Sequence, residues 1–115
     1  MGLEITRRKR NGATVLDVAG RLTAGAGANQ LRETIRALAD DGEQKVLLNL
    51  AGVAFLDSTG LGSLAAASEM LRLRGGQLRI VNATGPVRHV FQITRLNKVF
   101  PDVGDEDAAL ASFAA

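Results

Sequence analysis

Alternation of apolar and polar residues opens the chain and predicts two paired strands. Residues 3–7 alternate in this way, and residues 14–19 supply the returning strand. Asn11-Gly12 between them is the dipeptide typical of a tight hairpin turn. Residues 45–50 are instead almost continuously apolar, as expected for a strand of a parallel sheet that helices cover on both faces. The chain is therefore expected to begin with an antiparallel pair and to continue with parallel strands.

Four segments carry apolar residues at the spacing of a helix, so that one face of each can pack on the sheet. The residues that mark the first three are Leu31, Ile35 and Leu38, then Leu61, Leu64, Ala65, Ser68 and Leu71, then Val90, Phe91 and Ile93. The fourth helix is expected to begin at Asp105 and to bury Ala109, Leu110 and Phe113.

Two more strands complete the expected order. Residues 77–82 and 98–100 have apolar centres, and Pro101 stops the second strand. Residues 20–28 are rich in small side chains and are expected to form a loop. The order β-β-α-β-α-β-α-β-α predicts an α/β fold with a mixed sheet, antiparallel in its first hairpin and parallel thereafter through right-handed crossovers, and with about four helices packed on it.

The composition fits one small domain over residues 1–115. Hydrophobic residues make up 46% of the chain and aromatic residues only 3%, so the core must consist mostly of Leu, Val, Ile and Ala. The net charge is +2, and the basic run Arg8-Lys9-Arg10 is expected to be solvated, so nucleic acid is not expected as a partner. Without cysteine, a leader or a long apolar run, the chain is expected to be cytoplasmic and not bound to a membrane.

The stretch 53–64 leaves a strand, turns and opens a helix, and it carries the candidate chemistry. Asp57, Ser58 and Thr59 place side-chain oxygens where the first N–H groups of a helix lack partners, and capping is the ordinary explanation for them. The functional interpretation is that Ser58 receives a phosphoryl group from a partner protein. A phosphoserine there would carry about −1.5 to −2 charge at a helix end whose dipole tolerates anions.

The segment Asp57-Ser58-Thr59-Gly60-Leu61-Gly62 resembles the motif around the phosphorylated serine of the STAS domains, the sulphate transporter and anti-sigma factor antagonist family. Gly20-Arg21-Leu22-Thr23 is similar to a second family segment, usually Gly-x-Leu-Asp, from which it departs at Thr23. The resemblance runs from Leu3 to about Phe113 and is closest to the bacterial single-domain antagonists. It implies that the whole chain is one STAS domain.

In that family an anti-sigma factor with a kinase fold phosphorylates the serine, and a phosphatase restores it. The unphosphorylated antagonist binds the kinase and frees the sigma factor. Matched by position, Ser58 is the phosphoacceptor. We therefore expect a non-enzymatic switch whose two segments lie at the same end of the sheet. The residues expected to bind the partner are Arg21, Leu22, Thr23, Asp57, Ser58, Thr59, Gly60 and Leu61.

Other interpretations remain open. A STAS fold without the switch would act as a constitutive scaffold or as an accessory subunit of a signalling or transporter assembly, and Thr23 keeps that alternative in view. Residues 60–65 match the G-x-G-x-x-A pattern of a dinucleotide-binding fragment, but Asn82 stands about where an acid is needed. Ser58 lacks the preceding glycine of a nucleophile elbow, and His89 is the one histidine available as its base. No metal or cofactor is expected, and the oligomeric state stays open.

Overall fold

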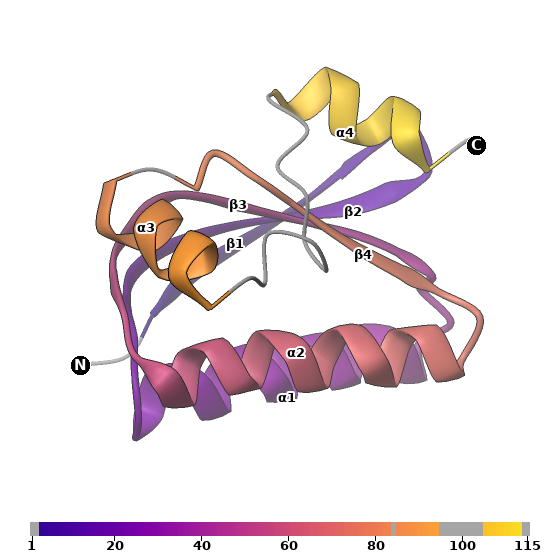
Figure 1. The fold of residues 1–115 in the computed structure, drawn as a ribbon. Helices are drawn as coiled ribbons and strands as arrows, with labels where there is room; N and C mark the ends of the chain where they lie inside the picture. Colours follow the sequence, from indigo (N-terminus) through magenta and orange to yellow (C-terminus); the bar gives the residue numbers. More distant parts are fainter. Residues whose placement is uncertain (1–2, 84, 95–104, 114–115) are drawn as a thin grey trace.

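The computed structural model describes residues 3–83, 85–94 and 105–113, which form a four-stranded sheet and four helices (Figure 1). In chain order the elements are β1 (Glu4–Arg10), β2 (Ala13–Leu22), α1 (Ala26–Asp40), β3 (Lys45–Leu56), α2 (Ser58–Leu73), β4 (Gln77–Val81), α3 (Gly85–Ile93) and α4 (Glu106–Ser112). The strands lie side by side in the order β1-β2-β3-β4, with β1 antiparallel to β2 and the rest parallel. The predicted mixed α/β sheet is confirmed. The strand expected at 98–100 lies outside the described residues.

Helices cover both faces of the sheet (Figure 1). α1 and α2 run side by side along one face, and α3 adds Val87 and Phe91 to the same core. α4 lies on the opposite face, where Leu110 and Phe113 pack in a second cluster with residues such as Leu47. Because successive residues of a strand point to opposite faces, β2 and β3 contribute to both clusters.

The first turn has the geometry that its sequence predicts. Asn11 and Gly12 connect β1 to β2 with φ angles of 51° and 81°. Positive φ at both central residues defines a type I′ turn, whose twist matches that of the flanking strands and for which Asn-Gly is a preferred pair. The predicted hairpin is confirmed.

The connection from β2 to α1 is shorter than expected, and β3 is longer. β2 continues through Leu22 and α1 begins at Ala26, both within the segment predicted as a loop. β3 continues past the apolar run at 45–50 to Leu56, because Val53 and Leu56 still have a core to pack against. Two irregularities in the pairing of β2 with β3 accompany this extension. The two strands therefore end as a pair, Leu22 opposite Leu56.

α3 departs from the prediction at one residue. Val87 and Phe91 are buried one helical turn apart, and Val90 packs partly against the core. Ile93, which was also expected to face inward, is 64% exposed. Ile93 follows Phe91 by two positions, which is about 200° around a helix, so the two side chains cannot share one face.

The basic run of β1 is not simply solvated, because it holds α4. Arg8 donates hydrogen bonds to Asp17 on β2 at 2.6 and 2.9 Å and to Glu106 on α4 at 2.6 and 3.0 Å. Arg10 also pairs with Glu106, and it donates to Asp107 at 2.8 Å. The hydrogen bonds that Glu106 accepts from Arg8, and next in importance those from Arg10, lower the pKa of Glu106 to about 2. The first strand and the last helix are thus joined by ion pairs.

A row of polar side chains continues this attachment across the sheet. Asn49 on β3 donates to Asp17 at 2.9 Å, and Asn82, just after β4, donates to Asn49 at 2.9 Å. Each member of the row has a partner within it. In the described part of the chain, no buried side-chain nitrogen or oxygen lacks a hydrogen bond. The row is therefore explained as a structural network.

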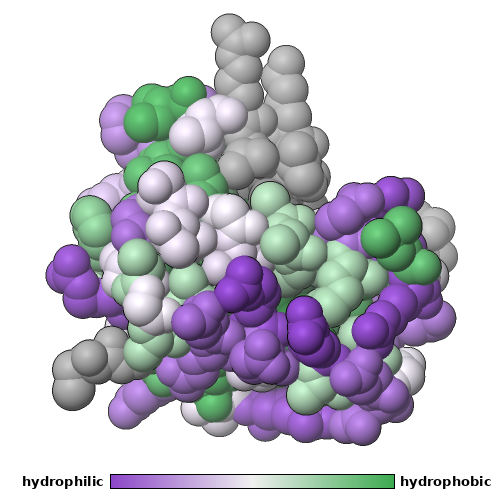
Figure 2. All heavy atoms as spheres, turned by 90° about the horizontal axis from the view of Figure 1, so that it is seen from below, coloured by the Kyte–Doolittle hydropathy of each residue, from purple (hydrophilic) through white to green (hydrophobic). Residues whose placement is uncertain are grey.

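Charged and small apolar side chains alternate over the outer surface of α1 and α2, which Figure 2 shows from below. The exposed charged residues of these helices include Arg32, Glu33, Arg36, Glu69 and Arg72. None of the described helices combines the length and the apolar character that a membrane span requires.

Candidate functional site

The turn from β3 into α2 is built on Asp57. This residue has an extended backbone, with φ −105° and ψ −176°, and serves as the N-cap of α2. Its Oδ1 accepts a hydrogen bond from the N–H of Gly60 at 2.8 Å, and its carbonyl accepts one from the N–H of Leu61 at 2.9 Å. The side chain satisfies one of the N–H groups that a helix leaves unpaired at its start. The predicted capping role is confirmed for Asp57.

The same carboxylate ties the two candidate segments together. Oδ2 of Asp57 accepts a hydrogen bond from the N–H of Ala24 at 3.0 Å, and the N–H of Asp57 donates to the carbonyl of Leu22 at 3.4 Å. The Ala24 N–H, followed by the Gly60 N–H, lowers the pKa of Asp57 below its usual range, because both bonds favour the ionised form. The expectation that both segments lie at one end of the sheet is confirmed.

Ser58 is the first residue of α2, and its side chain is exposed. Thr59 beside it is exposed as well. Within the described residues, the Ser58 hydroxyl makes no hydrogen bond, so it is not engaged in capping. The start of a helix carries a partial positive charge that favours an anion. An accessible hydroxyl at this place has the geometry for accepting a phosphoryl group.

Two glycines let the helices approach the end of β2 closely. A Cβ atom on Gly60 would lie 2.0 Å from the carbonyl oxygen of Leu22, and one on Gly27 would lie 2.5 Å from that of Arg21. Side-chain atoms cannot occupy such positions, so the starts of α1 and α2 both press against the backbone of Arg21 and Leu22. The site is therefore fixed to rigid elements on two sides.

The structure divides the predicted contact residues by exposure. Leu22 is fully buried, and Gly60 and Leu61 are also buried. A docked protein cannot reach the side chain of Leu22, which corrects its expected role: it packs in the core and positions the turn. Arg21, Ser58 and Thr59 are exposed, and Thr23 and Asp57 are half-buried, which completes the predicted set. The accessible part of the site is thus Ser58 with its neighbours and Arg21.

Phe55 belongs to this surface, although the sequence pattern did not mark it. The guanidinium of Arg21 lies 4.9 Å from the centre of the Phe55 ring, and Phe55 is 41% exposed. Strict alternation from the buried Val53 would place Phe55 inside. The irregular pairing between Gly20 and Arg21 turns it outward instead. The feature of the sequence that could have indicated the role of Phe55 is the position of this aromatic residue, two residues before Asp57.

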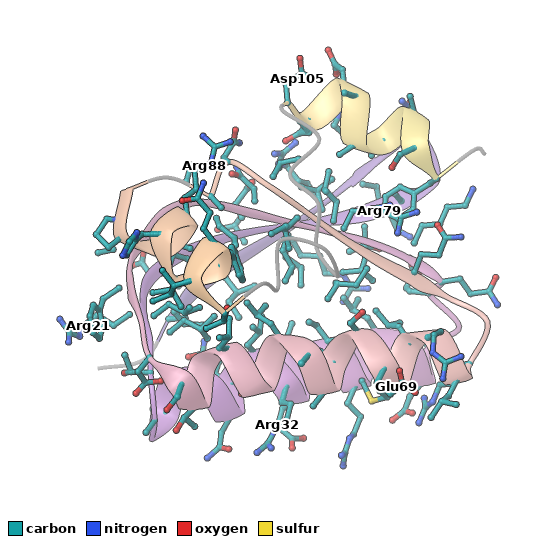
Figure 3. All side chains as sticks on the ribbon, viewed as in Figure 1. Arg21, Arg32, Glu69, Arg79, Arg88 and Asp105 are labelled. Carbon is teal, nitrogen blue, oxygen red and sulfur yellow. The ribbon has the colours of Figure 1, made fainter. Side chains whose placement is uncertain are left out.

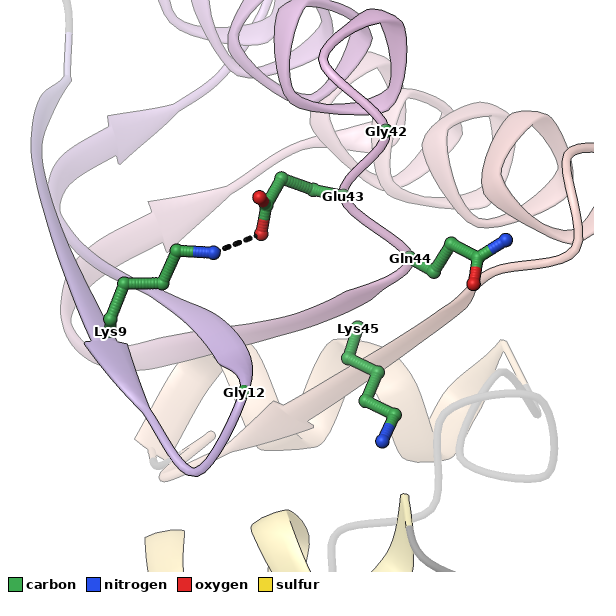
Figure 4. A pocket seen from close by; sticks show the side chains of 6 residues that line it. All are labelled: Lys9, Gly12, Gly42, Glu43, Gln44 and Lys45. Carbon is green, nitrogen blue, oxygen red and sulfur yellow. Dashed lines mark hydrogen bonds and ion pairs between the residues drawn. The ribbon is translucent and has the colours of Figure 1, made fainter.

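A shallow pocket lies at the other end of the strands (Figure 4). Its volume is about 220 Å³, and its lining includes Lys9, Glu43 and Lys45, the first residue of β3. Lys9 pairs with Glu43, which also accepts a hydrogen bond from the Thr14 hydroxyl at 2.5 Å. Lys9 and Glu43 neutralise each other within this pocket, which is separate from Ser58.

The sequence profile described as the STAS domain matches residues 4–108. The chain belongs to the STAS domain family. BtrV of Bordetella bronchiseptica, named as a candidate anti-sigma factor antagonist, is 30% identical to this STAS domain over 96% of the chain and 95% of its own length. The fold and the family resemblance expected from the motif around Ser58 are therefore confirmed.

Solved structures agree with this assignment. The crystal structure of an anti-sigma factor antagonist from Mycobacterium paratuberculosis matches this STAS domain with a TM-score of 0.85 and 28% identity, over 98% of this chain and 95% of that one. The Bacillus cell fate determinant SpoIIAA, in its phosphorylated form, matches with a TM-score of 0.71 and 22% identity, over 96% of this chain and 99% of its own. At that identity, the likeness to SpoIIAA shows a shared fold.

Proposed function

We propose that this STAS domain is an anti-sigma factor antagonist that binds an anti-sigma factor only while Ser58 is unphosphorylated. The observation that carries the proposal is the exposed, unbonded hydroxyl of Ser58 at the start of α2. The names of BtrV and of the Mycobacterium paratuberculosis protein support the same role. SpoIIAA, whose fold this chain shares, has been solved in a phosphorylated form, which supports the proposal that this scaffold can carry a phosphoryl group.

The switch would act at the docking surface. A phosphoryl group on Ser58 adds about −1.5 to −2 charge to an exposed position, beside the ionised carboxylate of Asp57. Both groups would repel an acidic partner surface, and an apolar one would have to desolvate them. Each ~1.4 kcal/mol of lost binding lowers affinity tenfold, so a modest repulsion is enough to release the partner.

The cycle needs two further activities, both in other proteins. The anti-sigma factor itself is proposed to be the serine kinase that modifies Ser58, so that binding and inactivation take place at one surface. A phosphatase acting on phosphorylated Ser58 would restore the binding form. While the antagonist holds the anti-sigma factor, the sigma factor is free to act.

Binding measurements on two Ser58 variants test the proposal. Ser58→Ala should bind the anti-sigma factor as the wild type does, whereas Ser58→Asp should bind at least about tenfold more weakly, because it places a charge in the interface. Gln77→Glu is the matched control, since it adds one negative charge at the start of β4, away from Ser58. After incubation with ATP and the kinase, intact mass should show one phosphate, which Ser58→Ala lacks.

The outcomes separate the alternatives. Equal binding by Ser58→Ala and Ser58→Asp would show that Ser58 carries no switch. A stable complex in which no phosphate is ever transferred would favour the constitutive scaffold. Weaker binding by Gln77→Glu to the same extent as Ser58→Asp would mean that net charge, and not the site, controls the affinity.

A further inference from the structure

Arg21 and Phe55 form a pair on the face of the sheet turned away from α1 and α2, at the ends of the two strands that lead into the site. They face each other across the register of β2 and β3, one position before Leu22 and Leu56. Those two leucines are buried in the core beneath α1 and α2. Because neighbouring residues of a strand point to opposite faces, Arg21 and Phe55 point away from that core. Figure 3 shows Arg21 directed outward at the edge of the molecule.

Neither side chain is needed for packing. Phe55, Leu73 and Ile93 are the large apolar residues that are exposed in the described part of the chain, and only Phe55 adjoins Ser58 in sequence. Within the same described residues, Arg21 makes no ion pair, and its recorded contact is the Phe55 ring. By contrast, Arg8 and Arg10 both pair with carboxylates. The pair therefore presents an uncompensated cation on an exposed aromatic ring.

We propose that Arg21 and Phe55 are the anchor through which this STAS domain binds the anti-sigma factor, with Arg21 taking a carboxylate and Phe55 the apolar surface around it. The inference rests on the proposed function and specifies its partner's chemistry: an Asp or Glu set in an apolar patch. A guanidinium that stacks its face on a ring keeps its N–H edge available for a bidentate bond to a carboxylate. Arg and aromatic residues are also those that most often dominate binding energy at protein interfaces.

The surroundings of the pair suit such a partner. Ala51, Gly52 and Ala54 on the same strand are exposed and small, so they do not obstruct a docked surface. The pair also stands close to the switch along the chain: Phe55 lies three residues before Ser58, and the N–H of Ala24, three residues after Arg21, donates to Asp57. An acidic group bound at Arg21 would be repelled by a phosphate on Ser58.

All anti-sigma factors of the source organism are first screened for binding to the wild-type chain. The test uses the one that binds. Arg21→Gln and Phe55→Ala should each weaken binding roughly tenfold or more, and the double variant should lose less than the product of the two, since the side chains touch. Lys45→Gln removes one positive charge at the far end of β3, and Leu73→Ala removes an exposed apolar side chain at the far end of α2. Both controls should bind as the wild type does.

A second measurement isolates the charge. Raising the salt concentration from about 50 to about 300 mM should weaken wild-type binding more than binding by Arg21→Gln, because screening acts on a pair that the variant no longer has. Phe55→Leu should recover part of the affinity lost in Phe55→Ala. Thermal unfolding should show that all of these variants remain folded, as expected for exposed positions.

Two failures have different meanings. If an anti-sigma factor binds the wild type, and Arg21→Gln and Phe55→Ala bind equally well, the anchor is wrong while the proposed function stands. If none of the anti-sigma factors binds the wild type, the proposed function fails and the anchor fails with it. An unchanged salt dependence in Arg21→Gln, together with weakened binding, would rule out a carboxylate as its target.

Discussion

The two glycines near the start of α2, Gly60 and Gly62, have opposite environments. Gly60 is buried, and a Cβ there would lie 2.0 Å from a backbone oxygen of Leu22. Gly62 is exposed, and a Cβ there would meet nothing within 4 Å. The motif that contains Ser58 therefore holds one glycine that the close packing on β2 requires and one that the fold does not.

Replacing each of these glycines with alanine should shift stability in opposite directions. Gly60→Ala forces α2 away from the end of β2 and should lower the free energy of unfolding by about 3 kcal/mol, as an overpacked core does. Gly62→Ala should raise it by about 0.5–1 kcal/mol, because glycine weakens an exposed helix position. Urea unfolding followed by circular dichroism measures both. Shifts in the same direction would contradict the packing of Gly60 against Leu22.

Among the elements, α4 is held by two kinds of contact. Ala109, Leu110 and Phe113 bury an apolar face against β2, β3 and β4. Arg8 and Arg10 reach Glu106 in its first turn. The side chain of Glu106 is only 19% exposed, so this pair is screened less than one on an open surface. The ion pairs should therefore add measurably to the stability of this helix.

The contribution of Glu106 should depend on pH. Its pKa falls from the ordinary 4.5 to about 2, so the ion pair stabilises the fold above about pH 4.5 and loses its contribution as the pH falls toward 2. Glu106→Gln should cost about 1 kcal/mol at neutral pH, a value reduced because both arginines are partly exposed. The difference from wild type should shrink toward about pH 3. Urea unfolding at a series of pH values measures it.

Glu69→Gln is the matched control for this prediction. Glu69 pairs with Arg72 within α2, and both side chains are exposed, so the substitution should leave stability unchanged at every pH. If Glu106→Gln loses the same amount of stability at low and neutral pH, the effect comes from packing and not from the ion pair.

At the scale of the whole molecule, local patterns were predictable and long-range pairings were not. The hairpin at Asn11-Gly12, the cap at Asp57 and the exposed Ser58 follow from residues close in sequence, and the structure has them. The bond between Arg8 and Glu106 joins residues 98 positions apart, which no periodicity records. Phe55 was missed for a similar reason, because its direction depends on how β3 pairs with β2.

The whole fold should be indifferent to the state of Ser58. The side chain is exposed and unbonded among the described residues, and the helix dipole that favours a negative charge there is opposed by the neighbouring Asp57. Ser58→Asp should therefore change the free energy of unfolding by no more than about 0.5 kcal/mol, the usual range for a surface substitution. Its effect on binding would then be local.

Ser63 provides the contrasting position in the same helix. Its side chain is buried, and its hydroxyl donates to the carbonyl of Ala28 on α1 at 3.3 Å. Ser63→Asp should lower the free energy of unfolding by at least about 3 kcal/mol, because it buries a charge between two helices. Urea unfolding of both variants, beside the binding assay, decides how the switch works. If Ser58→Asp lost stability together with affinity, phosphorylation would act by unfolding the site, whereas retained stability with lost affinity means that the partner senses the charge directly on an unchanged surface.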